Sequence, residues 1–97
     1  MTFDVVLAPE AAEDLRKLKT NVRRAVRSAL EKHLKHEPEK VSRSRIKRLR
    51  GVRRPQYRLR IGEVRVFYDA SDGTVEVLAI VAKSEAGKWL AQFASPE

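Results

Sequence analysis

The sequence of 97 residues contains no cysteine, only two histidines and a single tryptophan. Without cysteine the chain has no disulfide framework and no thiolate chemistry, and two histidines alone do not suggest a zinc site. No apolar run approaches the ~18 residues of a membrane-spanning helix, and the N-terminus lacks the basic start and long apolar core of a signal peptide. We therefore expect a soluble, cytoplasmic protein with no metal, no cofactor and no membrane partner.

What the sequence does have is an excess of positive charge, concentrated in one segment. The net charge is +8, from 21 Lys and Arg against 13 Asp and Glu. Residues 41–62 contain no acid and hold nine basic side chains, namely Arg43, Arg45, Lys47, Arg48, Arg50, Arg53, Arg54, Arg58 and Arg60. A localised basic segment of this kind is typical of a protein that binds a polyanion or an acidic protein partner.

The stretch YRLRIGEVRVFY at residues 57–68 is predicted to form a β-hairpin. Apolar and charged residues alternate on both sides of a central Gly62-Glu63 pair, which is the pattern of two strands joined by a type II′ turn. This turn fixes the register of the hairpin. The expected cross-strand pairs are Ile61 with Val64, Arg60 with Arg65, Leu59 with Val66, and Arg58 with Phe67.

In this register Arg58, Arg60 and Arg65 lie on one face of the hairpin, with Arg60 directly opposite Arg65. Like charges that face each other across two strands destabilise a sheet. One interpretation is that the arginines are ordinary surface charges neutralised by nearby carboxylates. The other is that they are kept for an external anion, because guanidinium groups match the geometry of phosphate.

The first part of the chain predicts a strand followed by two helices. Residues 2–7 read as a strand, and Pro9 suits the first turn of a helix that follows at once. A second helix is expected to begin at Thr20 or Asn21, and apolar residues at helical spacing continue it to Leu34. Because so few residues separate the helices, they should form an antiparallel hairpin.

The remaining segments predict strands and a short closing helix. Residues 39–55 read as a polar, basic connection, and residues 74–82 read as a central strand with apolar residues on both faces. Residues 84–93 form either a short helix or part of a mobile tail that extends to residue 97. We therefore expect one α+β domain over residues 1–97, in the order β-αα-βββ. Its helical hairpin packs on one face of a small, mainly antiparallel sheet, and the arginine-bearing face is left open.

The chain resembles a known family in two motifs, KRLRG at residues 47–51 and YRLRIGEVRVFY at residues 57–68. With the order of predicted elements, they are similar to the RelE/ParE superfamily of toxins from type II toxin–antitoxin pairs, over nearly the whole chain. In that superfamily, RelE-like members cut mRNA in the ribosomal A site. ParE-like members share the fold but inhibit DNA gyrase without nuclease activity.

The resemblance also implies roles for single residues. Arg58 and Arg60 match the basic residues of the first hairpin strand of RelE, and Arg65 matches the arginine of the second; these positions contact phosphates around the scissile bond. Nuclease members carry a further arginine and then a tyrosine. In this chain Lys83 retains a positive charge nearby, but Ser84 and Leu90 stand at those two positions.

We therefore take Arg58, Arg60, Arg65 and Lys83 as candidate catalytic residues. Arginine is a poor base, so a proton acceptor must be sought elsewhere, and Glu63, Glu76, Glu85 and Lys83 all stay open for that role. The connection supplies six candidate nucleic-acid contacts, namely Arg45, Lys47, Arg48, Arg50, Arg53 and Arg54.

The resemblance implies a toxin that acts as a ribosome-dependent mRNA endonuclease and inhibits translation. The alternative is a ParE-like toxin that inhibits DNA gyrase, and a third interpretation is a basic nucleic-acid-binding domain without toxicity. Both toxin interpretations imply a cognate antitoxin protein, together with either the ribosome and mRNA or gyrase. An acidic segment of the antitoxin is expected to cover the arginine face and the open sheet edges.

Overall fold

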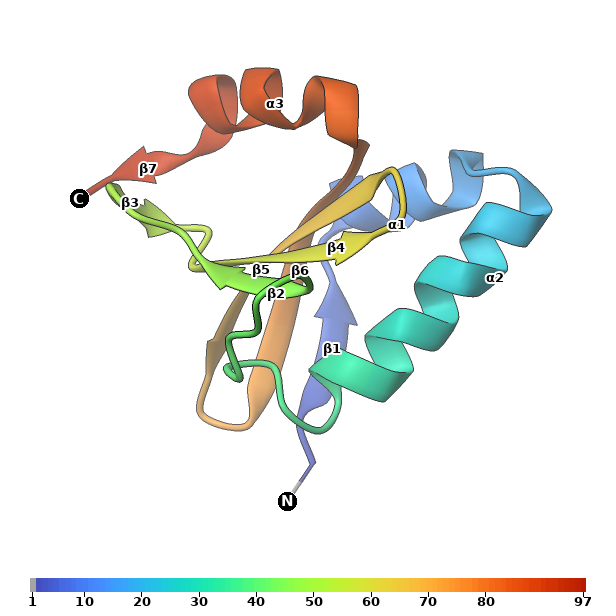
Figure 1. The fold of residues 1–97 in the computed structure, drawn as a ribbon, viewed down its shortest axis with the longest axis horizontal. Helices are drawn as coiled ribbons and strands as arrows, with labels where there is room; N and C mark the ends of the chain where they lie inside the picture. The colour runs from blue at the N-terminus through green and yellow to red at the C-terminus, as the bar shows by residue number, and fades with distance from the viewer. Residues whose placement is uncertain (1) are drawn as a thin grey trace.

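A five-stranded sheet forms the centre of the structure, a computed structural model that describes residues 2–97 (Figure 1). The strand order is β1 (Asp4–Leu7), β6 (Thr74–Ala82), β5 (Val64–Ser71), β4 (Tyr57–Ile61) and β2 (Ile46–Arg48). β1 runs parallel to β6, and every other pair of neighbours is antiparallel. The predicted α+β class with a mainly antiparallel sheet is confirmed.

A helical hairpin covers one face of this sheet. It consists of α1 (Pro9–Lys17) and α2 (Thr20–Ala29), and α2 continues into a π-helical turn, η1 (Leu30–Leu34). Pro9 occupies the start of α1, where its missing N–H has no intrahelical partner to lose. The hydrophobic core between the layers includes Leu15, Val26 and Leu34 from the helices and Leu59 from the sheet. No helix within residues 2–97 is both long enough and apolar enough to span a membrane.

The β4–β5 hairpin has the predicted register. Ile61 pairs with Val64 and Arg60 pairs with Arg65, and the remaining pairs follow in step. Gly62 has a φ of +56° whereas Glu63 keeps a negative φ, which is the combination of a type II′ turn. The turn matches the right-handed twist of the strands, so it fixes the register of the arginines without distorting the sheet.

Two expectations need correction. The connection over residues 39–55 is not irregular throughout, because it contributes β2 at the sheet edge and β3 (Val52–Arg54), which pairs with β7 (Ser95–Pro96). Three-residue strands show no periodicity in the sequence. The arginine-bearing face of the sheet, which was expected to be open, is partly covered by the end of the chain.

The chain after β6 turns through η2 (Lys83–Glu85) into α3 (Ala86–Phe93), so of the two alternatives for this segment the closing helix is the one present. Figure 1 shows α3 separated from α2 by the strands. Trp89 stacks on Phe67 with ring centroids 5.0 Å apart and planes 4° from parallel, and both Phe67 and Ala79 are buried. Phe67 lies on the same face as the arginines, so α3 covers that end of the face.

We predict that Tyr68→Phe lowers the free energy of unfolding by about 1–2 kcal/mol, the usual cost of an unsatisfied buried acceptor. The Tyr68 hydroxyl is buried and donates a 2.6 Å hydrogen bond to the carbonyl oxygen of Pro38. Burial, followed by the proximity of Tyr57 and Glu39, raises the pKa of Tyr68, so this hydroxyl stays protonated. Urea denaturation is the measurement.

Tyr57→Phe is the matched control, because the Tyr57 ring stacks on Tyr68 at 5.4 Å but its hydroxyl makes no hydrogen bond within residues 2–97. Equal losses of stability in the two variants would contradict a role for the Tyr68 hydroxyl.

Candidate nucleic-acid interface

Strands β4, β5 and β2 place four cations on one face of the sheet. Arg60 pairs with Arg65 and Arg58 pairs with Phe67, so the three arginines share a face as predicted. β2 adds a fourth cation, because Lys47 pairs with Arg58 across the β2–β4 ladder. We refer to Lys47, Arg58, Arg60 and Arg65 as the basic face.

Arg65 is the fixed member of the basic face. Its Nη1 donates to the carbonyl oxygens of Gly62 at 2.8 Å and of Val64 at 3.0 Å, and the residue is only 8% exposed. These bonds tie the guanidinium to the turn that sets the hairpin register. The carbonyls carry no net charge, so the positive charge of Arg65 is oriented by the protein but not neutralised.

Arg58 and Arg60 are less constrained. The Arg58 Nε is buried and has no hydrogen-bond partner within residues 2–97. Burial, and then the charges of Arg65 and Arg60, lower the pKa of Arg58. Arg60 is exposed. Among the described residues, 2–97, none of the three arginines forms an ion pair with a carboxylate, which disfavours the interpretation as internally neutralised surface charges.

Lys83 lies at the turn end of the basic face. Its backbone N–H donates to the carbonyl oxygen of Glu63 at 2.7 Å, and both residues line a shallow hollow with Ser84. Of the candidate proton-transfer residues, Glu63 and Lys83 therefore lie beside the hairpin turn to which Arg65 is hydrogen-bonded. The Glu76 carboxylate is not free for this role, because it forms an ion pair with Arg54.

The candidate contacts of the connection are all exposed, but they differ in their partners. Arg54 makes ion pairs with Asp69 at 2.8 Å and with Glu76 at 2.6 Å, and so joins the connection to β5 and β6. Arg48 donates to the carbonyl oxygen of Gln56. The side chains that make no ion pair within residues 2–97 are Arg45, Lys47, Arg48, Arg50 and Arg53.

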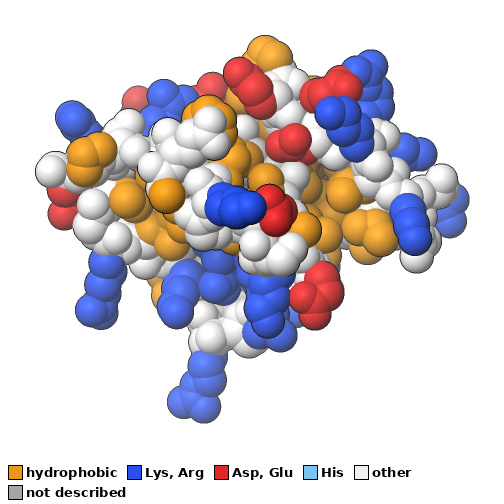
Figure 2. Space-filling model, turned by 90° about the horizontal axis from the view of Figure 1, so that it is seen from above, with side chains coloured by type: hydrophobic (Ala, Val, Ile, Leu, Met, Phe, Trp, Pro, Cys, Tyr) orange, Lys and Arg blue, Asp and Glu red, His pale blue; other side chains and the backbone are white. Residues whose placement is uncertain are grey.

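The free cations of the connection lie on β2, on β3 and in the turns beside them, so they extend the positive charge of the basic face beyond the edge of the sheet. Figure 2 shows Lys and Arg side chains grouped along one edge of the molecule. Such a surface can bind a chain of phosphates, and it does so in a salt-dependent manner. The sequence alone identified each cation but not the alignment of Lys47 with Arg58, since β2 is too short to be recognised.

The chain matches a known protein family over most of its length. Residues 5–87 match the family described as the ParE toxin of the type II toxin–antitoxin system parDE. No curated protein matches the chain in sequence.

Three solved structures with a similar fold are described as a toxin or as a toxin–antitoxin complex. The toxin–antitoxin complex RelBE2 from Mycobacterium tuberculosis matches with a TM-score of 0.70 and 27% identity, over 84% of this chain and 99% of that chain. The RelB–RelE antitoxin–toxin complex from Methanococcus jannaschii matches with a TM-score of 0.65 and 16% identity, over 87% of this chain and 96% of that chain. A copper-bound mutant toxin from Helicobacter pylori matches with a TM-score of 0.56 and 19% identity, over 86% of this chain and 97% of that chain. At these lower identities the last two show a shared fold.

We predict that Arg60→Gln raises the free energy of unfolding by about 0.2–1 kcal/mol, the cost of two like charges directly opposite each other in a sheet. Arg60 is exposed and faces Arg65, so its removal relieves repulsion without opening a cavity. Urea denaturation at low salt measures the gain, which added salt should reduce.

Arg43→Gln is the control, because it removes the same charge from an exposed position outside the sheet. The predicted repulsion is contradicted if this control stabilises the protein as much as Arg60→Gln does.

Proposed function

This chain belongs to the ParE toxin family of type II toxin–antitoxin systems, within the RelE/ParE superfamily, and we propose that it arrests growth by cleaving messenger RNA on the ribosome. One observation carries the proposal, namely that the three arginines of the hairpin share a face and have no carboxylate partner within residues 2–97. Their charge is therefore available to the phosphates of a bound message.

The proposed reaction is attack of a ribose 2′-hydroxyl on the adjacent phosphate. The new bond gives a 2′,3′-cyclic phosphate, the bond to the 5′-oxygen breaks, and the proton of the 2′-hydroxyl is transferred to a base while the 5′-oxygen gains one. Arg65, fixed by its carbonyl contacts, and Arg58 donate to the phosphate as its negative charge grows. One such preorganised donor is worth roughly 10²–10³ in rate.

In this proposal the ribosome supplies the proton-transfer groups that this chain lacks. Ser84 and Leu90 stand where RelE-like nucleases are expected to carry arginine and tyrosine, so the chain brings charge stabilisation but an incomplete set of proton-transfer groups. Glu63 and Lys83 are the groups at the turn end of the basic face. The free cations of the connection would hold ribosomal RNA phosphates and keep the basic face at the message.

Inhibition of DNA gyrase is the second candidate function. The family match is to ParE, and the missing arginine and tyrosine favour a toxin without nuclease activity. In that case the basic face would serve as a binding surface for a protein target. This candidate predicts DNA breaks with unaffected translation, whereas the nuclease predicts cut messages.

We also propose a cognate antitoxin as the partner of this chain. The 27% identical relative was solved as a toxin–antitoxin complex, and the unneutralised basic face is suited to an acidic segment. We predict that a small acidic reading frame beside the gene restores growth when it is co-expressed with the toxin. Plating efficiency measures the effect, and continued arrest in its presence contradicts the assignment of that reading frame.

The nuclease proposal is tested by expressing Arg58→Ala and Arg60→Ala variants in cells and mapping the 5′ ends of mRNA. The wild-type protein should arrest growth and leave cuts within translated messages, in step with the reading frame. Arg58→Ala should reduce cutting by roughly 10²-fold, the effect of removing one donor to the phosphate. Arg60→Ala should reduce cutting less, because the exposed Arg60 contributes charge to the face and not a fixed donor.

Arg24→Ala is the control, because Arg24 is an exposed arginine on α2, on the opposite side of the sheet. It should cut like the wild-type protein, and circular dichroism should show that all variants fold. Intact messages during growth arrest would exclude the nuclease, and DNA breaks in the same cells would support gyrase inhibition.

A further inference from the structure

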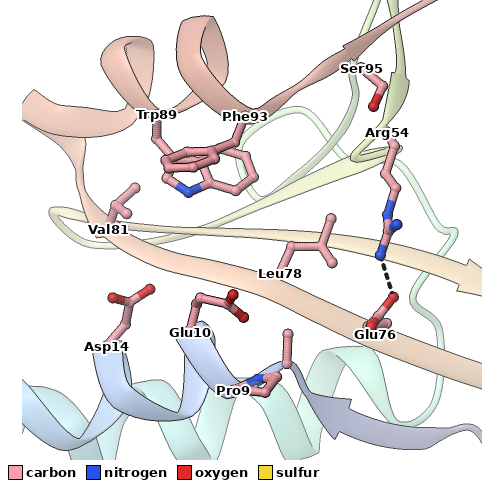
Figure 3. A pocket seen from close by; sticks show the side chains of 11 residues that line it. Pro9, Glu10, Asp14, Arg54, Glu76, Leu78, Val81, Trp89, Phe93 and Ser95 are labelled. Carbon is pink, nitrogen blue, oxygen red and sulfur yellow. Dashed lines mark hydrogen bonds and ion pairs between the residues drawn. The ribbon is translucent and has the colours of Figure 1, made fainter.

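A second site of opposite character lies between α1, the last part of β6 and α3. It is a pocket of about 580 Å³, a volume typical of ligand-binding clefts. Figure 3 shows the rings of Trp89 and Phe93 on one side and the carboxylates of Glu10 and Asp14 on the other. Leu78 of β6 lies between the two walls.

The acidic wall is unusual in a chain of net charge +8. Glu10 and Asp14 are one helical turn apart, where like charges repel, and neither forms an ion pair within residues 2–97. Asp14 is held in place because its Oδ2 accepts a 3.0 Å hydrogen bond from the backbone N–H of Ile80. The third acid, Glu76, is already paired with Arg54, which also lines the pocket, so Glu10 and Asp14 are the two unpaired acids. A cation bound beside Glu10 and Asp14 would relieve their repulsion.

The chemistry of the walls indicates what kind of cation fits. No group of three or more metal-ligating side chains is present within residues 2–97, so the carboxylates do not form a metal site. An apolar wall facing a pair of carboxylates suits a long side chain with an apolar stem and a charged end. Arginine and lysine have that form, and arginine can also donate to both carboxylates.

The outer side of β6 beside the pocket has no strand neighbour, but it does not offer a free ladder of backbone groups. β1 pairs with β6 only as far as Leu7 with Val77 within the described chain, and the Ile80 N–H beyond that point is already taken by the Asp14 carboxylate. A partner segment would therefore lie across the pocket and place a side chain into it without adding a strand to the sheet.

We propose that this pocket binds an arginine or lysine side chain of the antitoxin, presented by a segment that lies across the mouth of the pocket. Since the occupant is the antitoxin, this inference rests on the proposed function. The antitoxin would then contact the toxin at two sites of opposite charge, with acidic groups on the basic face and a basic group in the pocket. That arrangement fixes the direction of the antitoxin chain across the toxin.

The test compares antitoxin binding to wild-type toxin and to the double variant Glu10→Gln and Asp14→Asn. Isothermal titration calorimetry with the co-encoded antitoxin should show the dissociation constant rising about tenfold or more, because a cation in the pocket loses its partners. The control is Glu39→Gln with Glu97→Gln, which removes two exposed acids outside the pocket and should change the constant by less than about threefold.

The second arm identifies the basic residue. Each Arg and Lys of the antitoxin is changed to Gln, and one of these changes should weaken binding to wild-type toxin but have little further effect on the double variant. If no antitoxin residue shows this coupling, or if the double variant binds as tightly as the wild-type protein, the pocket inference is wrong. If wild-type toxin does not bind the antitoxin at all, the proposed partner itself is wrong.

Asp14→Asn changes the group that accepts the Ile80 N–H, so folding is checked by circular dichroism. If the double variant does not fold, Glu10→Lys carries the test, because Glu10 is exposed and the reversed charge repels the same cation. Unchanged affinity of Glu10→Lys for the antitoxin would then overturn the inference.

Discussion

Two guanidinium groups face each other across the β4–β5 hairpin, and the rest of the structure holds them there against their repulsion. The Gly62 turn fixes the register, and a slip by one residue would send the arginines to the opposite face, into the core. Arg65 is tied to the carbonyl oxygens of that same turn. At the other end of the face, the Phe67–Trp89 stack covers the hairpin. The fold therefore maintains an unneutralised charge at a fixed position, which is the condition for electrostatic recognition of an anion.

Charge in this protein is separated by location rather than balanced throughout. The basic segment looks uniform in sequence, but the structure divides it into residues with different tasks. Arg54 joins β3 to the sheet through Asp69 and Glu76, whereas Lys47 joins the basic face beside Arg58. The acids are divided in the same way, because Glu76 is paired within the protein while Glu10 and Asp14 face a pocket without a cation partner in residues 2–97. The free charges of opposite sign are therefore found on two separate surfaces.

The parts of the fold that could be predicted from the sequence are those that depend on local patterns. The hairpin register followed from strict alternation around Gly62-Glu63, and the helices followed from apolar spacing and Pro9. The alignment of Lys47 with Arg58 and the pairing of β3 with β7 depend on contacts between distant segments, in strands too short to show a period. The closing helix was one of two alternatives for its segment, and helix periodicity contains no information about the partner of a helix. The sequence therefore could not show that Trp89 on this helix would cover Phe67 on the arginine face.

The single tryptophan occupies an informative position. Trp89 lies between Phe67, which belongs to the face that carries the arginines, and Phe93, which lines the acidic pocket. Its indole is therefore a natural optical reporter at the boundary of both surfaces, free of background from any other indole in the chain. Emission from the unmodified protein can follow events on either surface without an attached dye.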